Sequence, residues 1–176
     1  MSKTASEHKS TVPTSIGFSL IIISTSRFEG VMRKETVVDP SGDVAVDLLR
    51  GVGYSVISKE IVSDDDAMIK TALGRALENP GVAVVVTCGG TGITPSDVTI
   101  ETVEPLFDKT LPGFGEVFRG ISYIRIGSPA ILTRATAGLI GGKAVFCLPG
   151  SPQAVELALK ELIIPEAGHI VKHARG

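Results

Sequence analysis

The sequence predicts an α/β protein of a single domain, in which helices cover both faces of a mostly parallel sheet to give three layers. Two observations predict this fold class. Apolar runs typical of buried strands alternate with segments of helical periodicity along most of the 176 residues. In addition, 43% of the residues are hydrophobic but only 5% are aromatic and none is Trp, as expected for a parallel-sheet core of Val, Ile, Leu and Ala.

The expected elements follow one another with short connections. Strands are expected at 18–24, 54–62, 82–86 and 144–150, and helices at 41–53, 66–78, 98–107 and 152–164. The helix at 66–78 carries an inward-facing apolar stripe of Ile69, Leu73, Ala76 and Leu77. The last helix begins with a capping Ser151 and with Pro152 at its first position. The segment 111–119, LPGFGEVFR, is expected to be a loop, and 1–15 a flexible polar tail preceding a domain at 16–176.

Charge and apolar patterning exclude several classes of protein. The 17 basic and 19 acidic residues leave a net charge of −2, which gives no electrostatic footprint for nucleic acid. No apolar run approaches the roughly 20 residues that span a bilayer, and the N-terminus lacks the apolar segment of a signal peptide. Cys88 and Cys147 are too few for a disulfide framework, so we expect buried small hydrophobes in a reducing compartment. A cytoplasmic domain without nucleic-acid or membrane partners is the expectation.

The stretch TCGGTGITPSD, 87–97, follows the buried strand expected at 82–86. Ligands of open α/β sheets bind at the carboxyl ends of strands, where such a turn lies. Glycines at 89, 90 and 92 allow close approach of the backbone, whose amides can cradle an anion such as phosphate together with the next helix N-terminus. Hydroxyls are offered by Thr87, Thr91, Thr94 and Ser96.

The same stretch also fits a purely structural interpretation. Thr94 followed by Pro95 and, three positions on, by Asp97 has the pattern of a capping box at a helix start. On this interpretation Asp97 stabilises a helix by about 1 kcal/mol and binds nothing. Residue chemistry alone leaves the phosphate site and the capped turn as alternatives.

A second glycine turn, LPGSP at 148–152, again links a buried strand to a helix. Two such turns in one parallel sheet emerge at the same edge, where two positive helix ends suit a ligand with several phosphates. Phosphate chemistry calls for Mg²⁺, usually held by one or two carboxylates, and Asp97 and the cluster 64–66 are the candidates. The alternative for two of the three clustered aspartates is compensation of a helix dipole.

The combination of TCGGTGITPSDVT, LPGFGE and LPGSP resembles the molybdopterin-binding domain of the MoaB/MogA type, from molybdenum cofactor biosynthesis. The resemblance extends from 16 to about 169, and ISTSR at 23–27 and DPSG at 39–42 fit it as well. It implies an ATP- and Mg²⁺-dependent adenylyltransferase. In this family the terminal phosphate of molybdopterin attacks the α-phosphate of ATP, and pyrophosphate leaves.

The family's catalytic, metal-holding aspartates correspond to Asp97 and Asp64. Ser63 stands where the family has proline before the second aspartate, so Asp65 is a possible substitute for Asp64. The resemblance also implies a substrate-binding set of Ser41, Thr87, Gly89, Gly90, Thr91, Gly92, Ser96, Pro149, Gly150 and Ser151. Arg27, Arg119 and Arg134 are nearest to the family-like segments, and either assist with phosphate or are solvated surface residues.

The resemblance further implies a homotrimer or homohexamer and hand-over of the product to a molybdotransferase, for molybdenum or tungsten. The main alternative is a catalytically silent molybdopterin-binding paralogue of the same pathway. A generic nucleotide-binding module is a third hypothesis. Glu116 in LPGFGE is either a further polar contact or part of a helix entry.

Overall fold

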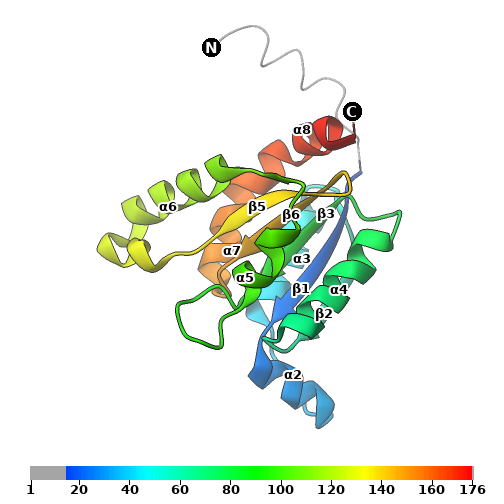
Figure 1. Cartoon of the computed structure of the whole chain (residues 1–176), viewed down its shortest axis with the longest axis vertical. Helices are drawn as coiled ribbons and strands as arrows, with labels where there is room; N and C mark the ends of the chain where they lie inside the picture. The colour runs from blue at the N-terminus through cyan, green and yellow to red at the C-terminus, as the bar shows by residue number, and fades with distance from the viewer. Residues whose placement is uncertain (1–14, 176) are drawn as a thin grey trace, which may run out of the picture.

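The structure is a computed structural model that describes residues 15–175, so the predicted tail, apart from Ser15, lies outside the described residues. Six strands form one sheet in the order β2-β1-β3-β6-β5-β4 (Figure 1). The strands are β1 (Gly17–Ile23), β2 (Ser55–Val62), β3 (Val84–Cys88), β4 (Lys109–Thr110), β5 (Thr136–Ile140) and β6 (Lys143–Leu148). The four strands β2, β1, β3 and β6 run parallel, which confirms the predicted fold class.

The other edge of the sheet is antiparallel. Strand β5 pairs antiparallel with β6, and the short β4 pairs antiparallel with β5. The tight connection between β5 and β6 is made by Gly141 and Gly142, which have φ angles of 55° and 75°. Glycine tolerates this left-handed conformation, which two-residue hairpin turns require. This hairpin was not among the expected elements.

The helices are α2 (Thr25–Met32), α3 (Pro40–Gly51), α4 (Asp66–Glu78), α5 (Thr99–Val103), α6 (Pro112–Ile126), α7 (Pro152–Ala158) and α8 (Ile164–Arg175). A π-helical segment, Leu159–Ile163, joins α7 to α8, and 3₁₀ turns occupy Glu104–Leu106 and Ser128–Leu132. No helix among the described residues is long and apolar enough to cross a membrane.

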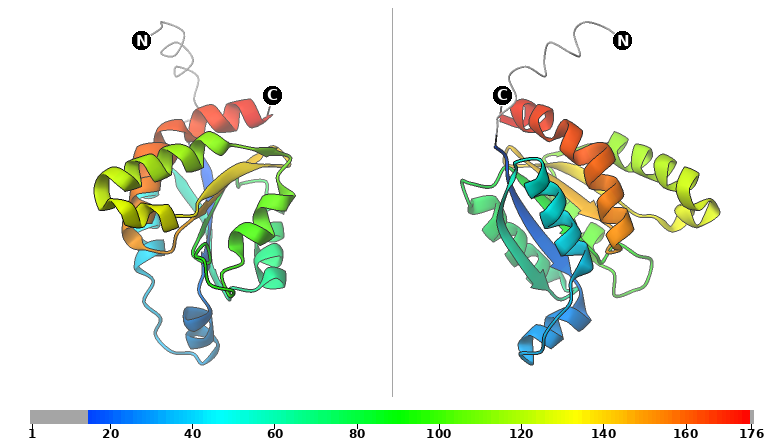
Figure 2. Two further views of the ribbon diagram at one scale, coloured as in Figure 1. Left: turned by 60° about the vertical axis from the view of Figure 1, so that its left-hand side comes forward. Right: turned by 180° about the vertical axis from the view of Figure 1, so that it is seen from behind.

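Helices pack on both faces of the sheet, as the three layers of Figure 2 show. On one face, strand residues such as Leu20, Val86 and Phe146 contact α3, α6, α7 and α8. On the other face, Ile21, Val85 and neighbouring side chains contact α4 and α5. Successive side chains of a strand point to opposite faces of the sheet, so each buried strand contributes side chains to both hydrophobic cores.

Side-chain caps set where several helices begin. The Asp65 carboxylate accepts a 2.9 Å hydrogen bond from the Met68 amide, which starts α4 at the predicted residue. The Ser151 hydroxyl accepts a 3.2 Å bond from the Ala154 amide, and Pro152 occupies the first helical position of α7, as predicted. Each bond satisfies an amide that the helix itself leaves unpaired.

Two predicted elements are wrong. The segment 111–119 is not a loop, because Pro112 begins the 15-residue helix α6. Its glycines concealed the helix, yet Gly113 and Gly120 leave open space around the helix and Phe118 anchors it in the core. The helix expected at 98–107 shrinks to the five residues of α5 and a 3₁₀ turn, because Pro105 cannot supply the amide that a continued α-helix needs.

Leu73→Ala tests the predicted inward stripe of α4. Leu73 is 1% exposed, so we expect a loss of about 2–5 kcal/mol in the free energy of unfolding, from lost burial and a residual cavity. Leu106→Ala is the matched control, because Leu106 is 40% exposed, and it should cost less than about 1 kcal/mol. Urea unfolding at one fixed protein concentration measures both, and equal losses would contradict the assignment of the core.

Candidate functional site

The carboxyl ends of β1, β3 and β6 meet at one edge of the sheet, beside the projecting helix α2 (Figure 1). A cleft of about 510 Å³ opens there. Both glycine turns line it, as do residues of α2 and of the segment before β5. The lining residues are Ile23, Ser24, Ser26, Arg27, Gly89, Gly90, Thr91, Gly92, Asp97, Pro129, Leu132, Thr133, Arg134, Pro149 and Gly150.

The two glycine turns touch each other and the end of β1. The Gly89 amide donates a 2.9 Å hydrogen bond to the Leu148 carbonyl, which extends the pairing of β3 with β6. A Cβ on Gly89, whose φ is 113°, would lie 2.1 Å from the Ile23 carbonyl oxygen, and a Cβ on Gly150 would lie 3.1 Å from the Gly89 Cα. Only glycine permits both this backbone conformation and this closeness.

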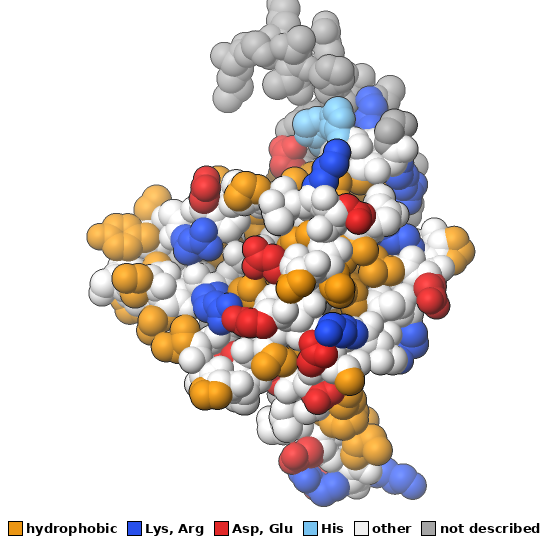
Figure 3. Space-filling model, viewed as in Figure 1, with side chains coloured by type: hydrophobic (Ala, Val, Ile, Leu, Met, Phe, Trp, Pro, Cys, Tyr) orange, Lys and Arg blue, Asp and Glu red, His pale blue; other side chains and the backbone are white. Residues whose placement is uncertain are grey.

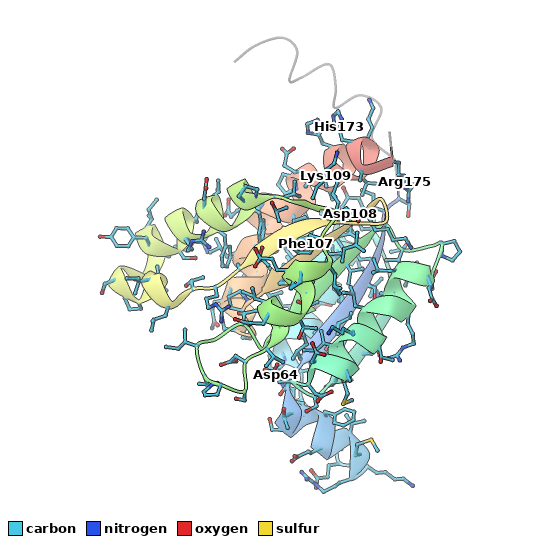
Figure 4. All side chains as sticks on the ribbon, in the orientation of Figure 1. Asp64, Phe107, Asp108, Lys109, His173 and Arg175 are labelled. Atoms are coloured by element: carbon cyan, nitrogen blue, oxygen red, sulfur yellow. The ribbon has the colours of Figure 1, made fainter. Side chains whose placement is uncertain are left out.

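Gly90 leaves room for the Asp64 carboxylate. A Cβ at position 90 would lie 2.6 Å from both carboxylate oxygens of Asp64. One of these oxygens accepts a 3.2 Å hydrogen bond from the Val98 amide, and the Thr99 amide bonds the Gly90 carbonyl at 2.9 Å. Asp64, labelled in Figure 4 where β2 leads into α4, therefore packs against the glycine turn although it is distant in sequence.

Gly92 leaves room for the Asp97 carboxylate in the same way. A Cβ at position 92 would lie 2.6 Å from Asp97 Oδ2. The same oxygen accepts a 2.9 Å bond from the Thr94 amide and a bond from the Thr94 hydroxyl, while the Asp97 amide donates 2.9 Å to the Thr94 carbonyl. These bonds close a turn over 94–97, but α5 begins only at Thr99, so Asp97 does not cap a helix.

The three clustered aspartates have separate surroundings. Asp65 caps α4, and Asp66 forms a 2.8 Å ion pair with Lys70 and accepts a 3.0 Å bond from the Thr102 hydroxyl. Only Asp64 lies against the glycine turn. Of the three aspartates, Asp64 is therefore the one placed beside the glycine turn, even though Ser63 precedes it.

The environments of the two carboxylates shift their pKa values in opposite directions. Burial raises the pKa of Asp64, and the nearby charges of Asp97 and Glu101 raise it further, against the opposing Val98 hydrogen bond. The Thr94 hydroxyl lowers the pKa of Asp97, with further lowering by the Thr94 and Gly92 backbone and by Arg134. The two aspartates are thus close enough to interact, and Asp97 is held firmly in its ionised form.

The remaining residues of the predicted substrate-binding set lie partly outside the cleft. Thr87 is fully buried within β3, Ser151 caps α7, and the exposed Ser96 hydroxyl lies 3.0 Å from that of Thr94. Ser41 is also fully buried, and its hydroxyl donates a 2.6 Å hydrogen bond to the Gly150 carbonyl. Ser41 therefore fixes the second glycine turn from behind.

The N-terminus of α5 offers fewer free amide donors to the cleft than expected. The Val98 and Thr99 amides at the start of α5 donate to Asp64 and Gly90, so these donors are already used. The cationic side chains that line the cleft are Arg27 on α2 and Arg134 before β5. Arg119 and Glu116 lie in a neighbouring hollow of about 330 Å³ that shares Thr133 and Arg134 with the cleft.

Several residues that line the cleft are absent from the predicted site. Ser24 and Ser26 belong to the ISTSR segment, which fits the family resemblance but is not part of the predicted substrate-binding set. No motif includes the lining residues Pro129, Leu132 and Thr133. They belong to the segment that precedes β5, the strand that pairs antiparallel with β6. Among the described residues, no three His, Cys, Asp or Glu side chains converge on a position for a metal ion.

Both thiols are buried as expected. Cys88 and Cys147 are free and lie within the two cores on opposite faces of the sheet. Burial raises the pKa of each to about 12, so both stay protonated and unreactive near neutral pH.

Fold and site together define an α/β protein with a cleft at the strand ends, where two glycine turns and Asp97 line the cleft and Asp64 packs against Gly90. The sequence matches the family described as probable molybdopterin binding domain over residues 19–169. The chain belongs to this family.

Individual relatives are similar over nearly their whole length. The chain is 48% identical over 165 residues to molybdenum cofactor biosynthesis protein B of Bacillus cereus, covering 93% of this chain and 94% of the relative. It is 46% identical over 173 residues to molybdopterin adenylyltransferase of Pyrococcus furiosus, covering 96% and 97%. The crystal structure of tungsten cofactor synthesizing protein MoaB from P. furiosus superposes with a TM-score of 0.83 at 45% identity, covering 93% of this chain and 99% of that one.

Substituting the two aspartates should change stability with opposite signs. Ionised Asp97 stabilises the fold above its ordinary pKa of 3.8, and this contribution is lost as the pH falls through the lower folded value. Ionised Asp64 destabilises the fold once the pH exceeds its raised pKa, and this cost is absent below 3.8. At pH 7, without metal, Asp64→Asn should therefore raise the free energy of unfolding, and Asp97→Asn should lower it.

Urea unfolding from pH 7 down to pH 4 checks this prediction. The stabilisation by Asp64→Asn should shrink as the pH falls through the raised pKa of Asp64 toward 3.8, because Asp64 of the wild type is protonated in both states only below that value. A decrease in stability for both variants at pH 7 would contradict the assigned environment of Asp64.

Proposed function

We propose that the protein is a molybdopterin adenylyltransferase of molybdenum or tungsten cofactor biosynthesis. An oxygen of the terminal molybdopterin phosphate attacks the α-phosphorus of ATP, and the bond from that phosphorus to the oxygen bridging to the β-phosphate breaks. The products are adenylylated molybdopterin and pyrophosphate. The relative named molybdopterin adenylyltransferase supports this proposal.

The observation that carries the proposal is the placement of two carboxylates on one glycine loop. Asp64 packs against Gly90 and Asp97 against Gly92, and the charge of Asp97 contributes to raising the pKa of Asp64. Two carboxylate donors are what Mg²⁺ commonly takes from a protein when phosphates and water supply its other ligands. The pair therefore offers the type and number of donors that the ion takes from a protein, and the ion would offset the charge of the triphosphate when bound.

Bringing two phosphate groups together also requires cationic and backbone donors. Arg27 lines the cleft with 28% of its side chain exposed and lies 3.8 Å from the buried Asp39 carboxylate. Lys59 lies 3.0 Å from the other oxygen of Asp39 and also pairs with Asp43 at 2.8 Å, so Arg27 belongs to a cluster of two cations and two carboxylates beside the cleft. Transfer between phosphates depends mainly on positioning and on charge stabilisation of this kind.

Pyrophosphate release from ATP and Mg²⁺, with and without molybdopterin, tests the proposal. The wild type should release pyrophosphate only with molybdopterin and should yield an adenylylated product. Asp97→Asn and Asp64→Asn should each lower kcat by about a hundredfold or more, since each removes a charged donor at the reacting groups. Asp65→Asn is the matched control, because asparagine caps a helix as well as aspartate does, and it should keep full activity.

Two results would separate the alternatives. Tight molybdopterin binding by the folded wild type without pyrophosphate release would identify the catalytically silent paralogue. ATP binding without any molybdopterin binding would instead indicate a generic nucleotide-binding module. Near-normal turnover of Asp97→Asn would remove Asp97 from the mechanism.

We also propose that the protein forms a homotrimer or homohexamer through α6 and the turn after it. Large apolar side chains gather there in Figure 3. Tyr123, Ile124 and Ile131 are 64%, 84% and 85% exposed. Large exposed apolar side chains gathered in one region are typical of a protein interface. Such an assembly would hand its adenylylated product to a molybdotransferase for metal insertion.

Sedimentation equilibrium tests this surface. The wild type should sediment as a trimer or hexamer, and Ile124→Lys should shift it toward the monomer because a charge is costly to bury in an apolar interface. Met32→Lys, at a 67% exposed position on α2, serves as the control for surface charge and should not change the assembly. A monomeric wild type would refute the proposal.

A further inference from the structure

Arg134 bridges two parts of the site. One guanidinium nitrogen donates a 2.9 Å hydrogen bond to the carbonyl of Gly92 in the glycine loop. The other forms an ion pair with Glu101 on α5. Although Arg134 borders the cleft, both of its contacts are thus to the protein. The planar, forked guanidinium can hold two partners at once, which a lysine cannot do in the same geometry.

The segment that carries Asp97 has little packing of its own. Ile93 is 67% exposed, and Thr94, Pro95 and Ser96 are exposed as well. Segments with few buried contacts open locally at low free-energy cost unless polar contacts hold them. The anchor on the N-terminal side of this segment is Gly92, whose carbonyl is the one that Arg134 holds.

The charges around the loop also need a cation. Asp64, Asp97 and Glu101 interact electrostatically with one another, and Arg134 is the cation whose charge acts on both Glu101 and Asp97. Its hydrogen bond lowers the pKa of Glu101, which keeps the ion pair intact over the neutral range. Without Arg134 the carboxylates would repel one another across an exposed loop.

We propose that Arg134 is a positioning residue, which clasps Gly92 to Glu101 and so fixes the Asp97 carboxylate at the cleft. Arg134 acts by holding the loop in place and does not contact the substrate. The catalytic part of this inference rests on the proposed adenylyl transfer, whereas its structural part does not.

A double-mutant cycle of Arg134→Gln and Glu101→Gln separates positioning from substrate binding. If the clasp positions Asp97, each single variant lowers kcat/KM for ATP by about tenfold. The double variant then loses no more kcat/KM than the more impaired of the two single variants. Arg75→Gln is the matched control, because it removes an exposed Arg–Glu ion pair, with Glu60, away from the cleft. It should leave kcat/KM unchanged.

Amide hydrogen exchange supplies a readout independent of activity. The Thr94, Asp97 and Val98 amides are hydrogen bonded in the loop. They should exchange about tenfold faster in Arg134→Gln and in Glu101→Gln, and at the wild-type rate in Arg75→Gln. These measurements need neither ATP nor molybdopterin, so they test the clasp even if the wild type transfers no AMP.

Two outcomes would overturn the inference. A loss of kcat/KM in Arg134→Gln with full activity in Glu101→Gln would make Arg134 a direct substrate contact. Unchanged amide exchange in both single variants would show that the clasp does not hold the loop. An inactive wild type would refute the proposed function alone, since the exchange result would still decide the clasp.

Discussion

The absence of side chains at three glycines in one loop is the constraint on which the site depends. At position 89 a Cβ would strike the carbonyl of Ile23, at 90 the carboxylate of Asp64, and at 92 that of Asp97. The first glycine lets β1, β3 and the second glycine turn meet, and the other two let a pair of acidic groups approach the backbone. Glycine motifs at strand ends are commonly explained by close approach of a ligand. Here the protein's own catalytic candidates occupy part of that space.

Much of the surrounding structure supports this loop. Ser41, at the start of α3, binds the carbonyl of Gly150 from a buried position. The Val98 and Thr99 amides, at the start of α5, hold Asp64 and the Gly90 carbonyl. Residues 41 and 64, which are distant in sequence from the first glycine turn, and the start of α5 therefore converge on two adjacent turns, which is how a rigid scaffold positions flexible loops that carry function.

The two aspartates differ in a way that suits a shared metal ion. Asp64 is destabilised as an anion by burial and by neighbouring carboxylates, so a divalent cation would relieve a cost that the free protein carries. Asp97 is stabilised as an anion by the Thr94 hydroxyl and by backbone amides, so it stays ionised without a metal. The ionised form of Asp64 lowers the stability of the fold, whereas that of Asp97 raises it. Such perturbed environments are common where groups are arranged for function.

Local patterns were sufficient where burial and capping are decided by neighbouring residues. The stripe containing Ile69 and Leu73 was recognised because helical periodicity reports burial directly, and Ser151 with Pro152 defined a helix start through chemistry confined to four residues. The helix α6 was missed because its glycines suggested a loop, whereas packing of Phe118 decides its conformation. The hairpin at Gly141 and Gly142 did carry a local signal, two adjacent glycines between apolar runs, that went unused.

The sequence by itself therefore determined the fold class, the two glycine turns and the chemical types of residue at the strand ends. Tertiary structure decided which aspartate of the cluster 64–66 reaches the loop, because that depends on the conformation of the connection between β2 and α4. It also decided that Thr87 is buried within β3 and that Thr133 and Arg134 reach the cleft. The physical reason is that the identity of a residue fixes which bonds it can make, while its distance to partners far along the chain is fixed only when the strands pair and the helices pack.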